Sequence, residues 1–397
     1  MLVCMVDRIL KLLNTKEGRA LVVRSQYDWS GAFDRQDPTK TVSKFISMGI
    51  RSSLIPVLID FLSGRSMRLK FNGKQAGPWP LVGGSPQGSY MGQLAYTTGS
   101  YDNTEQLDID EEDKFQYIDD LDLLELIILT DVLVEYDFRA HVASDIGLGQ
   151  RFLPPSATKT QSYHQGISDW TQLNLQKLNS DKSKYILHTR TKETFATRFT
   201  LDGSHINRET ATKSLGVWIG EDPSCWDINT KQIMKRTYAS MSMLTKLKYA
   251  GLSRTKLLHI YALHVRSSME YCSVVWHDNL TQAQTNAIER LQIVALKIIL
   301  GSDCPRLEDG HFNYNEALTI CKLDSLFSRR EKQVLDFGRK SIKHPTLKKL
   351  FPINPVISND PHTVRNRELF YVNRARTMAY YNSAIPAIQR RLNKHFS

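Results

Sequence analysis

The stretch KFQYIDDL, residues 114–121, sets two adjacent aspartates, Asp119 and Asp120, between apolar residues. Aspartate tolerates the backbone dihedral angles of tight turns, so the pattern predicts a β-hairpin with the acidic pair at its tip. Carboxylates are also the oxygen ligands that Mg²⁺ and Mn²⁺ prefer. A lone Asp-Asp pair is equally typical of a solvated turn, so a metal site depends on the rest of the sequence.

Two further segments, YDWSGAFDR (27–35) and GGSPQGS (83–89), favour the metal site. Asp28 lies 91 residues before Asp119 and follows the apolar run Ala20–Val23, which predicts a buried strand. If that strand and the hairpin are neighbours in one sheet, their carboxylates converge on one rim. The glycine-rich loop between them is of the kind that lets backbone approach a nucleotide closely. In this order the segments predict a nucleotidyl-transfer site with two divalent ions.

Charge is distributed unevenly along the 397 residues. Residues 1–150 carry 15 Lys and Arg against 21 Asp and Glu, a net charge of −6, whereas residues 151–397 carry 37 against 20, a net charge of +17. An acidic part with candidate metal ligands and a basic part suit a polyanion held against a metal site. The alternative is a basic protein whose Lys and Arg side chains are only solvated. The length is enough for two or three domains.

Cysteines and apolar runs indicate the compartment. The five cysteines are scattered and form no C-x-x-C pair, which predicts neither a zinc site nor a disulfide framework. They fit a reducing intracellular compartment, nucleus or cytoplasm, and not a secreted protein. The apolar runs are too short or too charged for a signal peptide or a membrane span. We therefore expect no membrane partner, and the sequence does not indicate an oligomeric state.

Hydrophobic periodicity predicts an α+β protein that becomes helical in its second half. Strands are expected at 20–23, 67–72, 184–190 and 196–203. Helices are expected at 1–14, at 39–62 with a break near Pro56, from the glycine-rich loop towards Gly99, at 156–175, from Ser253 onwards, and at 282–300 with a stop at Gly301.

These segments resemble a known family. YDWSGAFDR, GGSPQGS and YIDDL (117–121) are similar to motifs A, B and C of reverse transcriptases, most closely those of non-LTR (LINE-type) retrotransposons. LNSDKSKYIL (178–187) resembles motif D, and SLGVWI (214–219) resembles the hairpin that grips the primer. The resemblance implies a palm (an antiparallel sheet with packed helices) over residues 1–222, an all-helical thumb over 223–305 and a basic helical C-terminal extension over 306–397.

The resemblance also implies roles for individual residues of an RNA-directed DNA polymerase. Asp28, Asp119 and Asp120 match the catalytic carboxylates that bind two Mg²⁺ or Mn²⁺ ions. The residues matching substrate contacts are Phe33 (the gate against a ribose 2′-hydroxyl), Gln87 and Gly88 (template base and incoming nucleotide), Lys182 (triphosphate), and Leu215 and Gly216 (primer grip). The implied partners are an RNA template, a DNA primer or target, and dNTPs.

Most of these positions also have a simpler interpretation. Phe33 suits a buried strand end, and Lys182 suits a solvated loop. Gln87 and Gly88 suit a turn that initiates a helix, and Leu215–Gly216 suits a plain strand–turn. Only the joint pattern of the segments favours the enzymatic roles.

The sequence departs from the family pattern in two ways. The chain begins one helix before motif A, so the resemblance implies that the fingers and endonuclease regions are missing. Gln93 stands where many relatives have proline. Losing one good electrostatic contact alone can lower a rate by about 10²–10³-fold. We therefore expect a weak or inactive polymerase whose site is preserved in sequence.

Two other functions stay open. A catalytically dead, nucleic-acid-binding relic would use the tail RNRELFYVNRARTMAYY (365–381), where arginines neutralise phosphates and aromatic rings stack on bases. The residues concerned are Arg365, Arg367, Arg374, Arg376, Phe370, Tyr371, Tyr380 and Tyr381. A packed helix with a solvated basic face explains the same tail. An RNA-directed RNA polymerase is disfavoured, because Ile118 and not glycine precedes the acidic pair and because Phe33 is bulky.

Overall fold

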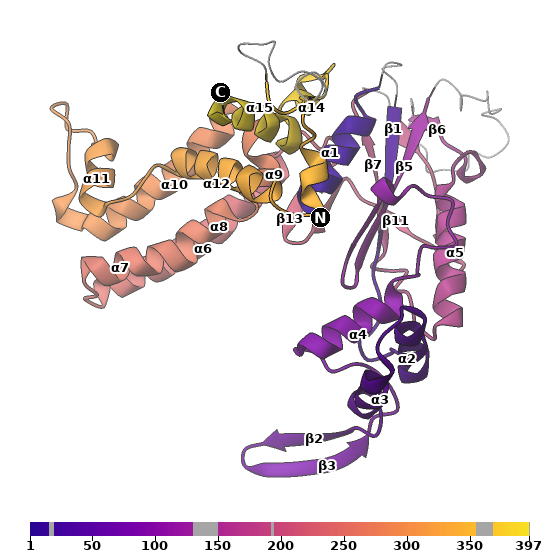
Figure 1. The fold of residues 1–397 in the computed structure, drawn as a ribbon. Coiled ribbons are helices and arrows are strands. Elements are labelled where there is room, and N and C mark those ends of the chain that lie inside the picture. Colours follow the sequence, from indigo (N-terminus) through magenta and orange to yellow (C-terminus); the bar gives the residue numbers. More distant parts are fainter. Residues whose placement is uncertain (16–19, 130–149, 192–193, 355–367, 397) are drawn as a thin grey trace. The chain divides into compact units, whose positions relative to one another are not determined.

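The computed structural model describes residues 1–15, 20–129, 150–191, 194–354 and 368–396 (Figure 1). Packing divides the chain into two compact units. The first unit comprises Met1 and Arg19–Thr210, and the second comprises Leu2–Gly18 and Ala211–Ser397. The three parts implied by the family resemblance are defined by motifs and not by packing, and they stay a prediction.

A five-stranded sheet in the order β11-β7-β1-β5-β4 forms the core of the first unit. Its strands are β1 (Ala20–Tyr27), β4 (Lys114–Tyr117), β5 (Asp120–Ile128), β7 (Lys184–Thr189) and β11 (Asn207–Arg208). The pairings are antiparallel except that of β11 with β7, which is parallel. The α+β class is confirmed, but the expected antiparallel sheet is mixed. The reason is that a short hairpin, β9 (Thr200–Leu201) and β10 (Ser204–His205), reverses the chain before β11.

One face of this sheet is apolar and packs on helix α5 (Thr160–Leu173), which lies alongside it in Figure 1. The shared core contains Leu21, Val23 and Tyr27 of β1, Leu121 and Leu123 of β5, and Tyr163, Ile167 and Trp170 of α5. Successive side chains of a strand point to opposite faces. The alternate residues Arg24, Gln26 and Asp28 therefore lie on the other face, where they adjoin buried apolar residues such as Val22 and Leu124.

Between β1 and β4 the first unit forms helices and a hairpin. They are α2 (Pro38–Ser47), a 3₁₀ turn (Ser52–Leu54), α3 (Ile55–Leu62), β2 (Ser66–Phe71), β3 (Lys74–Pro80) and α4 (Tyr90–Ser100). The strand predicted at 67–72 and the helix predicted towards Gly99 are confirmed. The break predicted near Pro56 is wrong. The chain leaves the helix at Gly49, where φ is +80°, and Pro56 lies in the first turn of α3, where its missing N–H costs no hydrogen bond.

The remaining elements of the first unit are short. They are 3₁₀ turns at Glu111–Asp113 and Pro155–Ala157, and a parallel pair of strands, β6 (Gln150–Phe152) and β8 (Thr194–Ala196). Helix α5 begins at Thr160 and not near Ser156 as predicted, because the intervening residues form one of these turns and an extended link.

The second unit is helical apart from one hairpin. Its elements are α1 (Leu2–Leu12), β12 (Ala211–Ser214), β13 (Val217–Gly220), α6 (Asp227–Tyr249), α7 (Arg254–Ile260), a π-helical turn (Tyr261–Arg266), α8 (Ser267–Glu270), α9 (Ser273–Trp276), α10 (Gln282–Leu300), α11 (Tyr314–Cys321), α12 (Leu326–Ser341), α14 (Met378–Tyr381) and α15 (Ala384–Phe396), with 3₁₀ turns at His277–Asn279, Gly301–Asp303 and Leu347–Leu350. The predicted helix 282–300 is confirmed. The apolar stretch after Ser253 is interrupted at Cys272, where φ is +52°. Within the described residues, no helix has the length and apolarity needed to cross a bilayer.

Asp7 on α1 makes the stability of the second unit depend on pH. Burial raises the pKa of Asp7 to about 6, although a hydrogen bond of 2.7 Å that the Ser383 hydroxyl donates to it acts in the opposite direction. An unfolded aspartate has a pKa of about 3.9, so protonated Asp7 contributes stability below that pH. This contribution is lost as the pH rises through about 6, and it amounts to about 3 kcal/mol.

We expect Asp7→Asn to remove this pH dependence and to stabilise the protein at neutral pH. The asparagine keeps an oxygen that can accept the Ser383 hydrogen bond but carries no charge. Free energies of unfolding measured between about pH 4 and pH 7.5 should fall more steeply for the unsubstituted protein than for the variant. Parallel pH profiles for the two proteins would contradict the assignment.

Candidate active site

The predicted hairpin joins β4 and β5, but its tip is shifted by one residue: Asp119 lies in the turn, whereas Asp120 is the first residue of β5. Tyr117 pairs with Asp120, so Ile118 and Asp119 form the two-residue turn. Ile118 has φ +60°, which is rare for a β-branched residue. The side-chain amide of Gln116 donates to the Ile118 carbonyl at 3.1 Å and to the Ser100 hydroxyl at 3.3 Å, and so ties the turn to the end of α4.

The register of β1 and β5 places Asp28 beside Asp120. Tyr27 pairs with Leu121, so the residue that follows Tyr27 adjoins the residue that precedes Leu121. Burial raises the pKa of both carboxyls, and the charge of Asp119 raises each of them further. The structure therefore brings the three predicted carboxylates to one rim of the sheet.

None of these three carboxylates has a salt bridge or a side-chain hydrogen bond to another described residue. Acidic groups that raise one another's pKa repel unless a cation lies among them. Lys182 and Lys184 lower the pKa of Asp28, but neither forms a salt bridge with it. An all-carboxylate donor set suits a hard ion such as Mg²⁺ or Mn²⁺. The carboxylate oxygens of Asp28, Asp119 and Asp120 do not all lie within 4.8 Å of one another. Another group of the described residues does have its ligand atoms within that distance.

That other group consists of His277, Asp278 and Glu331 in the second unit. Here a protein cation is already present, because the Arg391 guanidinium lies 2.5 Å from both the Asp278 and the Glu331 carboxylate. The His277 ring is 2.9 Å from Glu331. These contacts join residues next to α9 with α12 and α15, so the group is a structural ion-pair network and not a candidate metal site.

Lys182 lies in a loop that is bonded directly to the Asp28 backbone. The Asp28 carbonyl accepts from the Asn179 amide at 2.9 Å, and the Asp28 amide donates to the Ser183 hydroxyl at 3.1 Å. The Lys182 side chain is exposed, and its charge opposes the effect of burial on the pKa of Asp28. The segments that resemble motifs A and D thus meet at this carboxylate.

Phe33, Gln87 and Gly88 line one pocket of about 460 Å³. The other residues of its lining are Ser89, Tyr90, Gln93 and the turn residue Ile118. The Phe33 ring stacks on Tyr96 with centroids 4.5 Å apart. Burial and the charge of Asp119 raise the pKa of Tyr96, so the acidic turn is electrostatically coupled to the aromatic wall of the pocket.

Glycines hold the loop against the segment that follows Asp28. The Gly84 amide donates to the Gln36 carbonyl at 2.7 Å, and the Ser85 amide donates to the Phe33 carbonyl at 2.8 Å. A Cβ on Gly84 would lie 3.0 Å from the Phe33 carbonyl oxygen, and one on Gly92 would lie 1.8 Å from the Pro86 carbonyl oxygen. The sequence predicts that this loop approaches a nucleotide closely. In the structure its glycines allow a close approach to the chain's own backbone.

Leu215 and Gly216 belong to the second unit, where they form the turn between β12 and β13. Both have positive φ, +43° and +86°. The Tyr271 hydroxyl donates to the Leu215 carbonyl at 2.8 Å, and the Tyr271 ring would lie 3.0 Å from a Cβ on Gly216. The turn is therefore fixed by helical residues of its own unit.

The aromatic tail is only partly available for stacking on bases. Phe370 and Tyr380 are buried, which contradicts their predicted role, because Phe370 bonds to Asn393 and Tyr380 packs beneath α15. Tyr371 and Tyr381 are exposed, although the Arg390 guanidinium lies 3.6 Å from the centroid of the Tyr381 ring. Arg374 and Arg376 are described, whereas Arg365 and Arg367 lie outside the described residues.

Sequence reasoning missed a buried ion pair on the face of the sheet that carries Asp28. Arg24 Nε lies 2.9 Å from Asp122 Oδ1, and both side chains are 0% exposed. After burial and the charge of Asp119, Asp122 is the next cause that raises the pKa of Asp120, whereas Arg24 lowers it. The available signal was a charged residue of opposite sign in each of the two strands, Arg24 after the apolar run of β1 and Asp122 between the leucines of β5.

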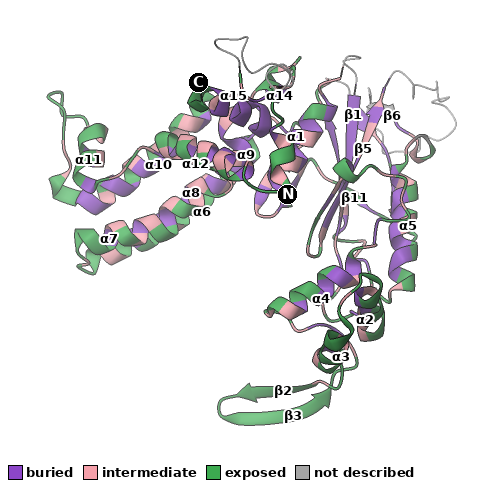
Figure 2. Ribbon diagram, in the orientation of Figure 1, coloured by how far each residue is buried: buried purple, intermediate pink, exposed green. Residues whose placement is uncertain are grey.

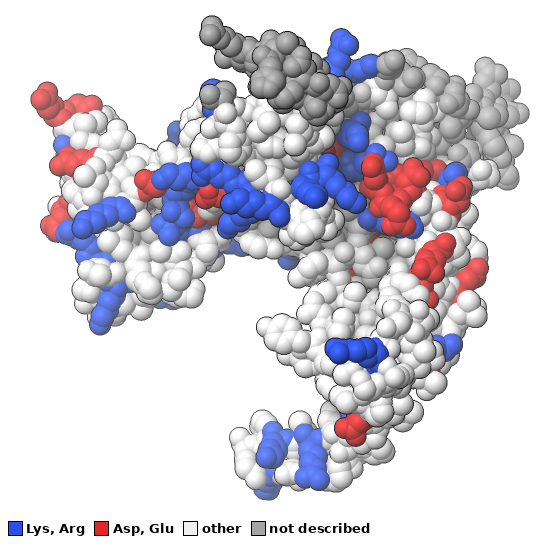
Figure 3. Space-filling model, viewed as in Figure 1, with Lys and Arg blue, Asp and Glu red and all other residues white. Residues whose placement is uncertain are grey.

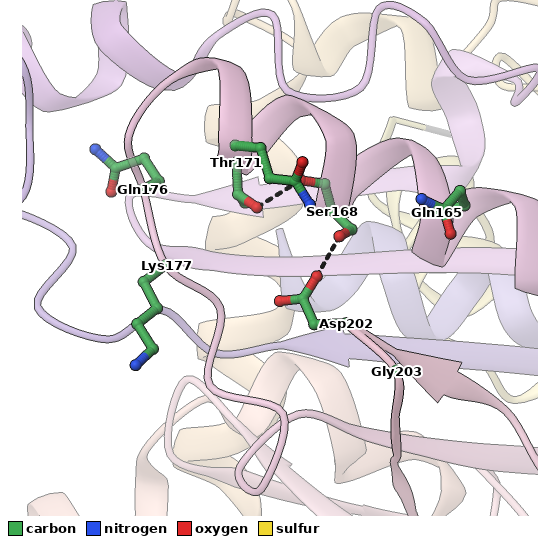
Figure 4. Close-up of a pocket in the computed structure, with 8 residues that line it drawn as sticks. Gln165, Ser168, Thr171, Gln176, Lys177, Asp202 and Gly203 are labelled. Atoms are coloured by element: carbon green, nitrogen blue, oxygen red, sulfur yellow. Dashed lines mark hydrogen bonds between the residues drawn. The ribbon is translucent and has the colours of Figure 1, made fainter.

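A second, polar pocket of about 360 Å³ lies between α5 and the turn joining β9 to β10 (Figure 4). Its one carboxylate, Asp202, accepts a hydrogen bond from Ser168, whose own carbonyl accepts from Thr171 at 2.6 Å. It contains none of the predicted site residues, although the side-chain oxygen of Gln176 in its lining is buried without a hydrogen-bond partner.

No protein-family model matches this sequence, and no curated protein matches it significantly. The functional case therefore depends on the motifs and on the geometry of the first unit.

Proposed function

We propose that the first unit carries a nucleotidyl-transfer site of the reverse-transcriptase type, on a sheet that serves as its palm. The observation that carries the proposal is the register of β1 and β5, which brings Asp28 to Asp120 and to the turn residue Asp119, while none of the three forms a salt bridge with a described residue. The order of the motifs along the chain supports it independently.

In this proposal the three aspartates present oxygen ligands to two Mg²⁺ or Mn²⁺ ions. Bound there, the ions would supply neutralisation of the transferred phosphoryl group and activation of the attacking 3′ oxygen. Lys182 adds a positive charge beside Asp28 for a triphosphate. Phe33, supported by Tyr96, limits the width of the pocket at the sugar and favours dNTPs. Gln87 and Gly88 contact the base pair from the glycine-rich loop.

The partners in this proposal are an RNA template, a DNA primer or target, and dNTPs. The net charge of +17 on residues 151–397 supports a polyanionic partner. One observation favours the alternative of a catalytically dead, nucleic-acid-binding relic, namely that the oxygens of the three carboxylates do not all lie within 4.8 Å of one another.

Primer extension on an RNA template tests the proposal. With Mg²⁺ and dNTPs, we expect weak extension that is abolished by Asp119→Ala and unchanged by Asp60→Ala, because both aspartates are exposed but only Asp119 lies at the site. Salt-dependent RNA binding should be the same in all three proteins. If none of them extends the primer while all bind RNA, the relic is the correct assignment. Extension that survives in Asp119→Ala would contradict the proposed site.

A further inference from the structure

The hairpin of β2 and β3 is exposed along its whole length (Figure 2). Met67 pairs with Trp79, Leu69 pairs with Ala76, and Phe71 pairs with Lys74. Because side chains alternate across a strand, Met67, Leu69, Phe71 and Trp79 lie on one face. These four side chains are 45–73% exposed. An isolated two-stranded hairpin is marginally stable in water, so an uncovered apolar face indicates a binding surface.

Charge identifies what this surface binds. The stretch 61–101 contains four Lys and Arg and no Asp or Glu, although residues 1–150 as a whole carry a net charge of −6. Three of these cations lie on the hairpin itself: Lys74 shares the face of its partner Phe71, whereas Arg68 and Lys70 alternate to the opposite face of the two-stranded ribbon. Figure 3 shows blue side chains crossing the hairpin without a red one. A partner for this surface is therefore anionic, which disfavours a second copy of the same hairpin.

Aromatic spacing distinguishes a nucleic acid from other anions. The Phe71 ring and the Met67–Trp79 pair are four residues apart along the strand, or roughly 13 Å. Flat rings at intervals along a basic groove are the usual platform for unpaired bases, and they bind with little regard to sequence. The tip of the hairpin is Asn72–Gly73, which is polar and does not suit insertion into a lipid bilayer.

The base of the hairpin is fixed to the glycine-rich loop of the candidate site. The Arg65 guanidinium donates to the Gly83 carbonyl at 2.8 Å and also to the Gly84 carbonyl, and the Arg65 carbonyl accepts from the Leu81 amide at 2.8 Å. A strand bound on the hairpin is therefore connected through a few residues to the pocket lined by Gln87 and Gly88.

We propose that the β2–β3 hairpin is a binding surface for single-stranded nucleic acid, with Phe71 and Trp79 stacking on bases and Arg68, Lys70 and Lys74 neutralising phosphates. The choice of nucleic acid rests in part on the proposed function. The surface itself contains none of the three aspartates, so it does not require that the chain be an active polymerase.

Binding of a fluorescein-labelled single-stranded RNA of mixed sequence, measured by anisotropy in EDTA, tests the inference separately from catalysis. We expect Phe71→Ala and Trp79→Ala each to weaken binding about tenfold. Replacing Arg68, Lys70 and Lys74 by glutamine should lower the slope of log affinity against log salt by about 2. All five side chains are exposed, so unchanged thermal unfolding is expected. Asp119→Ala should bind like the unsubstituted protein.

A matched control replaces Lys343, Lys348 and Lys349, which are also exposed, by glutamine. Equal weakening by this control would indicate a general charge effect and overturn the inference. RNA binding that is unchanged in all hairpin variants would also overturn the inference. That conclusion holds even if the variants lose binding to phosphatidylserine–phosphatidylcholine vesicles or lose a dimer in sedimentation. Of the tryptophans, which all lie in the described ranges, Trp79 alone is exposed, so quenching of its fluorescence by RNA gives a direct second readout.

Discussion

Replacing Asp28 by asparagine is expected to abolish Mg²⁺-dependent nucleotide incorporation while stabilising the metal-free protein. Loss of one ligand in a charge-stabilising site lowers a rate by at least about 10²–10³-fold. In the metal-free state, however, the Asp28 carboxylate is partly desolvated and repelled by Asp119, and both effects raise its pKa. Asparagine has the same shape and no charge, so it removes the repulsion together with the function.

The sign of the pH dependence follows from the raised pKa. The folded state holds the Asp28 proton more tightly than the unfolded state does, so the associated stability is present below about pH 4 and is lost as the pH rises through the raised pKa. The asparagine variant lacks this loss. Thermal unfolding in EDTA at neutral pH should therefore show a higher midpoint for Asp28→Asn, and added Mn²⁺ should raise the midpoint of the unsubstituted protein alone. A lower midpoint in EDTA with an undiminished Mn²⁺ shift would contradict the metal assignment.

The largest loss of stability is expected from breaking the buried pair of Arg24 and Asp122. Arg24→Met removes the cation that lies 2.9 Å from a carboxylate with 0% exposure, and separating a buried pair in this way costs about 3–5 kcal/mol. The free energy of unfolding, measured with denaturant, should fall by that amount. The double variant Arg24→Met/Asp122→Leu removes both charges and should recover most of the loss.

The double variant also gives the outcome that would contradict this account. If the double variant is no more stable than Arg24→Met, the loss of stability comes from packing around the arginine and not from the buried charge of Asp122. Activity adds a second comparison, because Arg24 and Asp122 act on the pKa of Asp120 in opposite directions. A stable double variant with altered metal affinity would show that the pair also tunes the site.

The sequence predicts local structure well where a pattern of a few residues decides it. The hairpin at Asp119, the strand before Asp28 and the helix that ends at Gly301 are all confirmed. Strand β1 continues to Tyr27, beyond the predicted end at Val23. Its polar residues extend the strand because β5 and β7 pair with it on both sides, which is information from distant parts of the chain.

Features that depend on tertiary neighbours were not predictable from single segments. The parallel strand β11 is two residues long, and no periodicity can reveal it. The interleaved tail fitted both a base-stacking surface and a packed segment, and the burial of Phe370 and Tyr380 favours packing for these two residues. The N-terminal helix was predicted correctly, but its place in the second unit follows from packing against α9, α14 and α15, which lie far along the chain. For the candidate site, the sequence singled out three aspartates, and the register of β1 and β5 shows that Asp28 adjoins Asp120 beside the turn at Asp119.

The left-handed turn at Ile118 has a consequence for the evolutionary record of this chain. A β-branched residue at φ +60° costs about 1–2 kcal/mol, and glycine would relieve it. The Asp28 charge also lowers the stability of the metal-free protein. Selection for stable folding alone would therefore favour glycine at 118 and asparagine at 28. Among related sequences, those selected for folding alone should therefore carry glycine at 118 and asparagine at 28 before the residues of their cores change.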